Sequence, residues 1–351
     1  MELQDWLSKA IWPIEDKLTK EDIYFASKLG CIEMIKSGTT TFNDMYFFEE
    51  ETARAVDETG IRANLGRAIV FDGEEADKRL KEAENLYKRC NGTAEGRIRI
   101  NLPPHAPYTC NKETLGKCVE MAQKYKMQIH IHLSETAKEN EDIIKQNGQT
   151  PTEYLNECGI FNVPCILAHA VYLNEKDIKI IKKANAGIIH NPISNLKLAS
   201  GIADIIKYRQ EKIKVGLGTD GAGSTNSLDM FEEMRACSLL QKISYKKASV
   251  INAYTILKMA TIEGAEVLGL QDQIGSLEEG KLADIIILNL NKPHLQPLHN
   301  IYSTLVYSCT GQDVETTIVD GKILMENQKL HIDDEEQIIK KCNEIKVKYM
   351  I

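Results

Sequence analysis

Short apolar segments that end in a histidine or an aspartate recur through the middle of the chain. Continuous apolar runs are typical of parallel strands that are buried on both faces. In a (β/α)8 barrel the carboxyl ends of the strands meet at one face, so polar residues at these ends would form a single site. The segments are Ile98–His105, Gln128–Leu133, Cys165–His169, Gly187–His190 and Lys214–Asp220.

Helical and strand patterns alternate along the chain from Thr19 onward, which predicts repeated β/α units. Counting from Thr39 to Asp220 gives seven strands, whereas a closed barrel has eight. We therefore expect a TIM-like (β/α)8 barrel that lacks its first strand, with that strand preceding Met1. The predicted strands begin at Thr39, Arg62, Ile98, Met127, Cys165, Ala186 and Lys214.

The pattern changes near residue 270. One long helix is predicted over 248–268, and a turn-rich segment then leads to an apolar strand at 285–288. Two alternating segments flank Asp320-Gly321, a dipeptide that favours a β-hairpin. The last segment, 333–350, has helical spacing. We therefore divide the chain into a barrel (1–270), a small β-sandwich-type appendage (271–330) and a C-terminal helix (331–351).

Composition and charge narrow the range of partners. The chain has 43 basic and 51 acidic residues, a net charge of −8, and no basic stripe with interleaved aromatic residues, which argues against nucleic acid. No apolar run is long enough to cross a bilayer, and the first residues do not resemble a signal peptide. The nine cysteines are scattered without a Cys-x-x-Cys pair. We expect a cytoplasmic protein with reduced cysteines and no membrane partner. The sequence does not set its oligomeric state, and a homo-oligomer is one option.

The predicted strand ends contain candidate metal ligands and proton carriers. His130 and His132 share one face of a strand, and His132 is nearer its carboxyl end. Glu135 follows that strand, where it can either reach over the site as a proton carrier or cap the next helix. Asp220, flanked by glycines, is either a ligand or a turn former.

Three further histidines fit the same face of the predicted barrel. His169 can hydrogen-bond an attacking water or be a satisfied core residue. His105 lies in a proline-stiffened loop that can orient a substrate. His190 precedes a polar loop, and a scaffold role is equally compatible with its position.

Together these motifs resemble the metal-dependent amidohydrolase superfamily and, within it, the 5-methylthioadenosine/S-adenosylhomocysteine deaminases. The resemblance covers nearly the whole chain and is most specific for the superfamily. The segments that carry it are Ile11–Glu15, Ser37–Phe42, His105–Thr109, His130–Glu135, His190–Gly201, Gly218–Gly221 and Gly275–Asp284.

The resemblance implies hydrolytic deamination of an adenosine-type nucleoside by a metal-activated water. It implies that His132 and Asp220 bind the metal, and that Glu135 passes a proton to the purine ring. His105 and Glu15 would contact the substrate, with Glu135 and Asp220, and His169 would lie near the nucleophilic water. One divalent ion is expected, with zinc first and iron or manganese as alternatives.

One motif of the family is absent from this sequence. Members carry a His-x-His pair on the first barrel strand that supplies two more ligands, whereas the His-x-His pair here is His130/His132 at the fifth-strand position. We expect weak metal binding, because a catalytic zinc ion normally has three protein ligands. Two alternatives remain: a non-catalytic remnant, and a related amidohydrolase acting on guanine, cytosine or a chloro-triazine.

Overall fold

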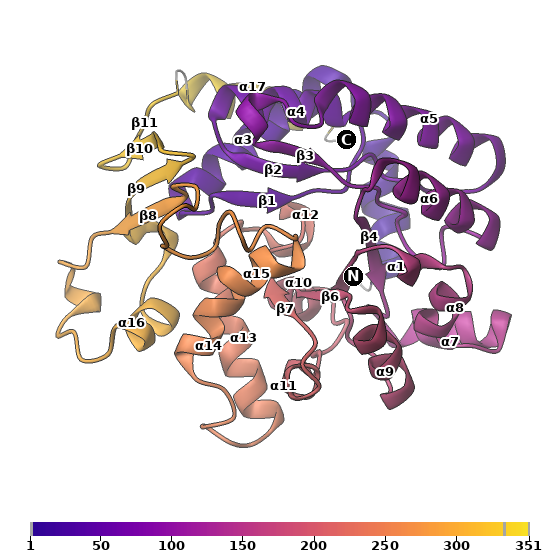
Figure 1. The fold of residues 1–351 in the computed structure, drawn as a ribbon. Helices are drawn as coiled ribbons and strands as arrows, with labels where there is room; N and C mark the ends of the chain where they lie inside the picture. Colours follow the sequence, from indigo (N-terminus) through magenta and orange to yellow (C-terminus); the bar gives the residue numbers. More distant parts are fainter. Residues whose placement is uncertain (1–2, 333–334, 350–351) are drawn as a thin grey trace.

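The computed structural model describes residues 3–332 and 335–349. Its centre is an array of parallel strands (Figure 1), which comprises β1 to β7. Backbone ladders join β1-β2-β3 and β4-β5-β6-β7, and a bridge between Leu102 and Ile129 links the two groups. Within the described residues, no ladder joins β7 to β1. The expected strand before Met1 stays a prediction. The strands are β1 (Thr41–Asn43), β2 (Arg62–Leu65), β3 (Ile98–Ile100), β4 (Ile129–Leu133), β5 (Cys165–His169), β6 (Gly187–His190) and β7 (Val215–Leu217).

Helices connect the strands and cover the outside of the array, as the β/α pattern predicts. Alternation along β4 buries Ile129, Ile131 and Leu133 and turns His130 and His132 to the other face. The helices are α3 (Lys20–Ser37), α4 (Glu49–Thr59), α5 (Gly73–Cys90), α6 (Lys112–Tyr125), α7 (Ala137–Asn147), α8 (Pro151–Glu157), α9 (Glu175–Ala184), α10 (Pro192–Lys197), α11 (Ile205–Gln210), α12 (Ala222–Thr225) and α13 (Met230–Ser244).

Local sequence signals fix where α3 begins and ends. Thr19 and Asp22 form a capping box, in which the Asp22 carboxylate accepts from the Thr19 backbone N–H at 2.8 Å. Gly38 ends the helix with φ at +87°. A Cβ atom at Gly38 would lie 2.9 Å from the Val314 side chain, so both the backbone angle and the packing require glycine.

The predicted single helix over 248–268 is wrong. The structure has two helices instead, α14 (Ala253–Met259) and α15 (Ile262–Val267), with a break at Thr261. The break turns α15 against β6 and β7, where a Cβ atom at Gly216 would lie 2.9 Å from the Gly264 backbone. Close packing on the barrel therefore outweighs continuation of the helix.

An antiparallel sheet and a final helix follow the barrel. In the described residues the appendage is one four-stranded sheet and not a sandwich, because the sheet packs on α3 of the barrel. The strand order is β11-β10-β9-β8, and β9 and β10 form the hairpin around Asp320 and Gly321, which both have positive φ. These elements are β8 (Ile285–Leu288), β9 (Val314–Val319), β10 (Lys322–Glu326), β11 (Lys329–Leu330), α16 (Ile301–Tyr307) and α17 (Glu335–Tyr349), with single 3-10 turns at Ala94–Gly96, Ile160–Asn162, Pro293–Leu295 and Gly311–Asp313.

This sheet is joined to the barrel by a shared core and a buried ion pair. Val314 and Met325 belong to the same hydrophobic cluster as the barrel strands. Arg62 of β2 donates two hydrogen bonds to Asp284, at 2.8 and 2.9 Å, and both side chains are buried. The division at residues 270 and 330 stays a prediction.

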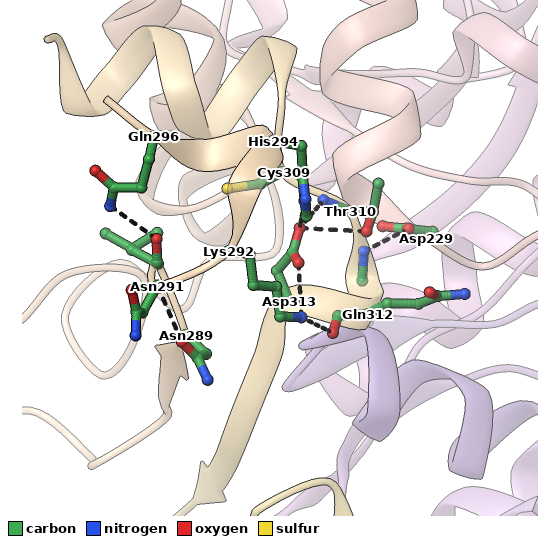
Figure 2. A network of polar contacts seen from close by, with 12 residues as sticks. Asp229, Asn289, Asn291, Lys292, His294, Gln296, Cys309, Thr310, Gln312 and Asp313 are labelled. Carbon is green, nitrogen blue, oxygen red and sulfur yellow. Dashed lines mark hydrogen bonds and ion pairs between the residues drawn. The ribbon is translucent and has the colours of Figure 1, made fainter. Parts of the chain in front are cut away.

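A second polar network anchors the loop before β9 (Figure 2). The Asp313 carboxylate accepts hydrogen bonds from the Lys292 ammonium at 2.8 Å and from the Thr310 backbone N–H at 2.9 Å, and His294 Nε2 lies 3.1 Å away. Burial tends to raise the pKa of Asp313, but the hydrogen bonds from Lys292, Thr310 and His294 outweigh it and lower the pKa to about 2.

Asp313→Asn is expected to reduce stability at neutral pH and to have less effect in acid. A lowered pKa stabilises the fold above the usual aspartate pKa, and that contribution is lost as the pH falls toward 2. Losing a hydrogen bond to a charged group typically costs about 1.5–3 kcal/mol, which sets the scale expected at neutral pH. Urea unfolding of both proteins at about pH 7 and about pH 3 measures the difference. An equal difference at both pH values would contradict the assignment.

The N-terminal segment lies over the carboxyl end of the barrel. It consists of α1 (Leu3–Trp6), a π-helical turn (Leu7–Ile11) and α2 (Trp12–Glu15). Leu3 and Leu7 pack with Leu198, which follows β6, and the Trp6 ring lies close to Gly223, which follows β7. No helix in the described part of the chain has the length and apolar character needed to cross a membrane.

Candidate active site

Three of the predicted site residues stand together at the carboxyl ends of the strands. His132 is near the end of β4 and His169 ends the neighbouring β5, and their ring centroids are 5.4 Å apart and nearly parallel. Asp220, beyond β7, joins the same group, because its carboxylate accepts from Ser194 and His169 contacts the adjacent Asn195. The structure thus brings together residues that are up to 88 positions apart in the sequence.

The backbone is strained where it presents these side chains. Ser134, His169 and Asp220 have φ values of +49°, +69° and +64°, in a region that residues with a side chain rarely occupy. Such conformations cluster at functional sites, where the surrounding packing enforces them. These three positions lie at or just after the ends of β4, β5 and β7, where the predicted site residues meet.

Hydrogen bonds fix the orientation of both histidines. His132 Nδ1 lies 2.7 Å from the His105 carbonyl oxygen, an acceptor, so Nδ1 carries the proton and Nε2 has a free lone pair. His169 Nδ1 lies 2.8 Å from Asn195 Oδ1, which assigns the same tautomer. Asn195 is not among the predicted site residues. It lies on α10, the helix that the structure has where the sequence predicts a polar loop after His190.

Glu135 faces the histidines and does not cap the following helix. Its carboxylate lies 3.7 Å from His169 Nε2, and the Ser200 hydroxyl donates to it at 3.4 Å. Thr136 caps α7 instead, and Glu139 accepts from the Glu135 backbone N–H at 2.7 Å. Burial raises the pKa of Glu135 to about 7, with a further increase from Asp220, while His132 and Ser200 act to lower it.

The Asp220 carboxylate is held by three donors. The Ser194 and Ser224 hydroxyls donate to Oδ2 at 2.6 and 2.8 Å, and the Gly221 backbone N–H donates to Oδ1 at 2.7 Å. Burial tends to raise the pKa of Asp220, but His169, Ser194, His132 and Ser224 outweigh it and hold the pKa below its ordinary value. A carboxylate in this setting stays ionised and can accept a proton.

The other two predicted substrate contacts, His105 and Glu15, lie within and beside the segments that follow β3 and β1, respectively. The His105 ring centroid is 4.8 Å from that of His132, and burial, with the nearby histidines, lowers the pKa of His105 well below its usual value. Glu15 is placed against Tyr46, whose hydroxyl donates to its carboxylate at 2.7 Å. Tyr46 follows β1, so Glu15 also stands at the carboxyl end of the barrel.

A layer of amides fills the barrel interior below the site. Asn43 Oδ1 accepts from the side-chain amides of Asn64 at 2.6 Å and Asn101 at 2.8 Å, and its Nδ2 lies 2.9 Å from His130 Nδ1. His130 is therefore part of this layer. His190 is fully buried, and neither ring nitrogen has a hydrogen-bond partner within the described residues.

The site contains two of the protein ligands that a catalytic metal ion would need. His132 Nε2 and the Asp220 carboxylate are chemically suited to zinc. Among residues 3–332 and 335–349, however, no three His, Cys, Asp or Glu side chains gather closely enough to hold a metal ion. The described donors therefore do not complete a catalytic metal centre, which needs three protein ligands.

Known proteins share both sequence and fold with this chain. The amidohydrolase family model matches residues 1–324. A 5-methylthioadenosine/S-adenosylhomocysteine deaminase of Carboxydothermus hydrogenoformans is 50% identical over 337 residues, 96% of this chain and 78% of that protein. A 5'-deoxyadenosine deaminase of Methanosphaera stadtmanae is 47% identical over 340 residues, 96% of this chain and 80% of that protein.

Solved structures agree with this assignment. A zinc-bound adenosine deaminase from Xanthomonas campestris superposes with a TM-score of 0.95 at 32% identity, covering 99% of this chain and 80% of that one. A zinc-bound atrazine chlorohydrolase from Arthrobacter aurescens shares the fold, with a TM-score of 0.90 at 24% identity and coverage of 98% and 82%. This chain belongs to the amidohydrolase family.

Proposed function

We propose that this protein hydrolyses the exocyclic amino group of an adenosine-type nucleoside, giving the inosine analogue and ammonia. The observation that carries the proposal is that the buried Glu135 faces His169 at the strand ends where three donors hold the Asp220 carboxylate. Burial raises the pKa of Glu135, whereas at Asp220 the nearby histidines and serines outweigh burial and hold the pKa low. Two carboxyl groups with separated pKa values can act as acid and base at the same pH. The relatives named as deaminases of such nucleosides support the same reaction.

Each group has a defined place in the proton transfers. As the oxygen of water bonds to the amino-bearing carbon, Asp220 accepts a proton from the water and Glu135 donates one to the adjacent ring nitrogen. Asp220 then passes its proton to the amino group, which leaves as ammonia when the C–N bond breaks. The remaining hydroxyl proton returns to Glu135 as the carbonyl forms. His169, held by Asn195, is placed to hydrogen-bond the water.

The residues beside the catalytic group, Glu15 and His105, indicate the substrate class. Glu15 offers a carboxylate to hydroxyl donors, such as the ribose diol, and His105 lies in a rigid loop beside His132. Relatives named for 5-methylthioadenosine, S-adenosylhomocysteine and 5'-deoxyadenosine differ in the 5' substituent. We therefore propose a 5'-modified adenosine as the substrate.

The proposed metal is zinc, with His132 and Asp220 as its protein ligands. Zinc is present in the matched adenosine deaminase structure. Because two ligands hold an ion less tightly than three, we expect this chain to lose metal on dialysis and to depend on added Zn²⁺, Fe²⁺ or Mn²⁺. Metal analysis before and after dialysis against a chelator measures this loss. Stoichiometric zinc that survives the chelator would contradict a site with two protein ligands.

A substrate panel tests the proposed reaction, with ammonia release as the readout for the amino-bearing substrates and chloride release for the chloro-triazine. The panel contains 5-methylthioadenosine, S-adenosylhomocysteine, 5'-deoxyadenosine, guanine, cytosine and a chloro-triazine, each with and without added metal. Preferential release from the adenosine derivatives is expected. Activity on the bases or the chloro-triazine alone would identify a related hydrolase, and no activity with any substrate would identify a non-catalytic protein.

A further inference from the structure

We propose that Tyr46 is a positioning residue that holds the Glu15 carboxylate in place to accept the ribose hydroxyl groups of the substrate. This inference rests on the proposed function, because it concerns how the same site selects a nucleoside. A glutamate or a tyrosine alone would not indicate this role. The role is inferred from the hydrogen bond between Glu15, at the end of α2, and Tyr46, which follows β1.

The geometry leaves half of the Glu15 carboxylate for a ligand. The Tyr46 hydroxyl donates to Glu15 Oε1 at 2.7 Å. Within the described residues, the Glu15 carboxylate accepts no other hydrogen bond, and Oε2 accepts none. A carboxylate can accept several donors, so Oε2 and the remaining lone pair of Oε1 can meet two hydroxyl groups of a diol.

Tyr46 is anchored to the barrel, which makes it a fixed donor. Its backbone N–H donates to the Gly66 carbonyl and to the buried Glu49 carboxylate at 3.1 Å, and its carbonyl accepts from Ala68 at 2.8 Å. Its ring stacks on that of Phe47, with centroids 4.1 Å apart. The barrel therefore sets the position of the hydroxyl group, and the hydroxyl group sets the position of Glu15.

Glu15 needs such a partner because its own segment supports it weakly. It is the last residue of α2, a four-residue helix, and the neighbouring Trp12 and Ile14 are exposed. Burial raises the pKa of Glu15, Asp16 raises it further, and the Tyr46 hydrogen bond opposes both. Burial also raises the pKa of Tyr46, so the hydroxyl group stays protonated and remains a donor.

The segment that carries Glu15 also touches the strand ends near the catalytic group. Trp6 lies close to Gly223, which follows β7 shortly after Asp220, and Leu3 packs with Leu198 after β6. Glu15 lies at the other end of the same segment, beside β1. A nucleoside bound at the mouth of the barrel would thus have the catalytic carboxylates on one flank and Glu15 on another.

Tyr46→Phe tests the role, because it removes one oxygen atom and keeps the stacked ring. With 5-methylthioadenosine, we expect KM to rise about tenfold and kcat to change less than twofold, as for one lost hydrogen bond to a charged group. With the 2',3'-dideoxy analogue, which lacks the hydroxyl groups, we expect no change in KM. Tyr24→Phe is the matched control, because the Tyr24 hydroxyl donates to Glu58 at 2.6 Å away from the site.

Equilibrium binding separates this proposal from the proposed reaction. Calorimetry with 5'-methylthioinosine and its 2',3'-dideoxy analogue needs no turnover, so the hydroxyl-dependent loss remains measurable in a chain that does not release ammonia. Equal weakening for both ligands, or none for either, would overturn the role of Tyr46. Glu15→Gln serves where Tyr46→Phe does not fold; it should show the same hydroxyl-dependent loss, and its absence would also overturn the proposal.

Discussion

Glu135→Gln should lower kcat for nucleoside deamination by about 10²–10⁴-fold, the range typical of a lost general acid. The amide keeps the size of the side chain and can still accept from Ser200, but it has no acidic proton for the ring nitrogen. Steady-state kinetics with 5-methylthioadenosine and added metal measure the effect. Glu157→Gln, an exposed carboxylate paired with Lys112, is the matched control and should leave kcat unchanged.

The pH dependence of kcat is a second test of Glu135 as the proton donor. The pKa of Glu135 is raised to about 7, so its acid form is present below that pH and is lost above it. We expect kcat to fall as the pH rises through about 7, and we expect this limb to disappear in Glu135→Gln. A decrease of less than fivefold in the variant, with the limb retained, would assign the proton to another group.

The largest expected effect on stability is that of Asp284→Ala, at about 3–5 kcal/mol of unfolding free energy. The substitution leaves the guanidinium of Arg62, whose side chain is 5% exposed, without its paired carboxylate. It also removes the acceptor of the Asp320 backbone N–H at 2.9 Å. Urea unfolding monitored by circular dichroism measures the loss.

A double variant separates the cost of an unpaired charge from the value of the pair. Arg62→Met with Asp284→Leu removes both charges and keeps most of the buried volume, so it should recover much of the stability lost in Asp284→Ala. A double variant that is less stable than Asp284→Ala would show that the ion pair itself stabilises the contact between β2 and the sheet of β8 to β11.

The sequence predicts the barrel strands well because five of the seven are short apolar runs with a polar residue at or after the end. All seven appear in the structure, and His132, His169 and Asp220 converge as the strand ends require. The break at Thr261 could not be predicted in this way, because it depends on how closely α15 approaches Gly216 of β7. Local helical spacing carries no information about that contact.

The residues that hydrogen-bond to the site residues also could not be predicted from sequence patterns. Asn195, Ser194 and Glu139 lie in loops or helix starts, where polar residues are common and have many possible uses. Their roles depend on distances across the barrel mouth, which only the fold sets. Site residues could be predicted from strand ends, whereas the groups that orient them could not.

The amide layer around Asn43 has a consequence for how the barrel comes apart. Between β3 and β4 the main chain makes one bridge, Leu102–Ile129, and three hydrogen bonds, from the N–H groups of Leu102, His130 and His132. Asn43 belongs to one ladder and His130 to the other, and their 2.9 Å contact spans the interior. Native-state hydrogen exchange should therefore show the two ladders opening together in the wild-type protein and separately in Asn43→Ala, so that this residue sets the size of the cooperative unit.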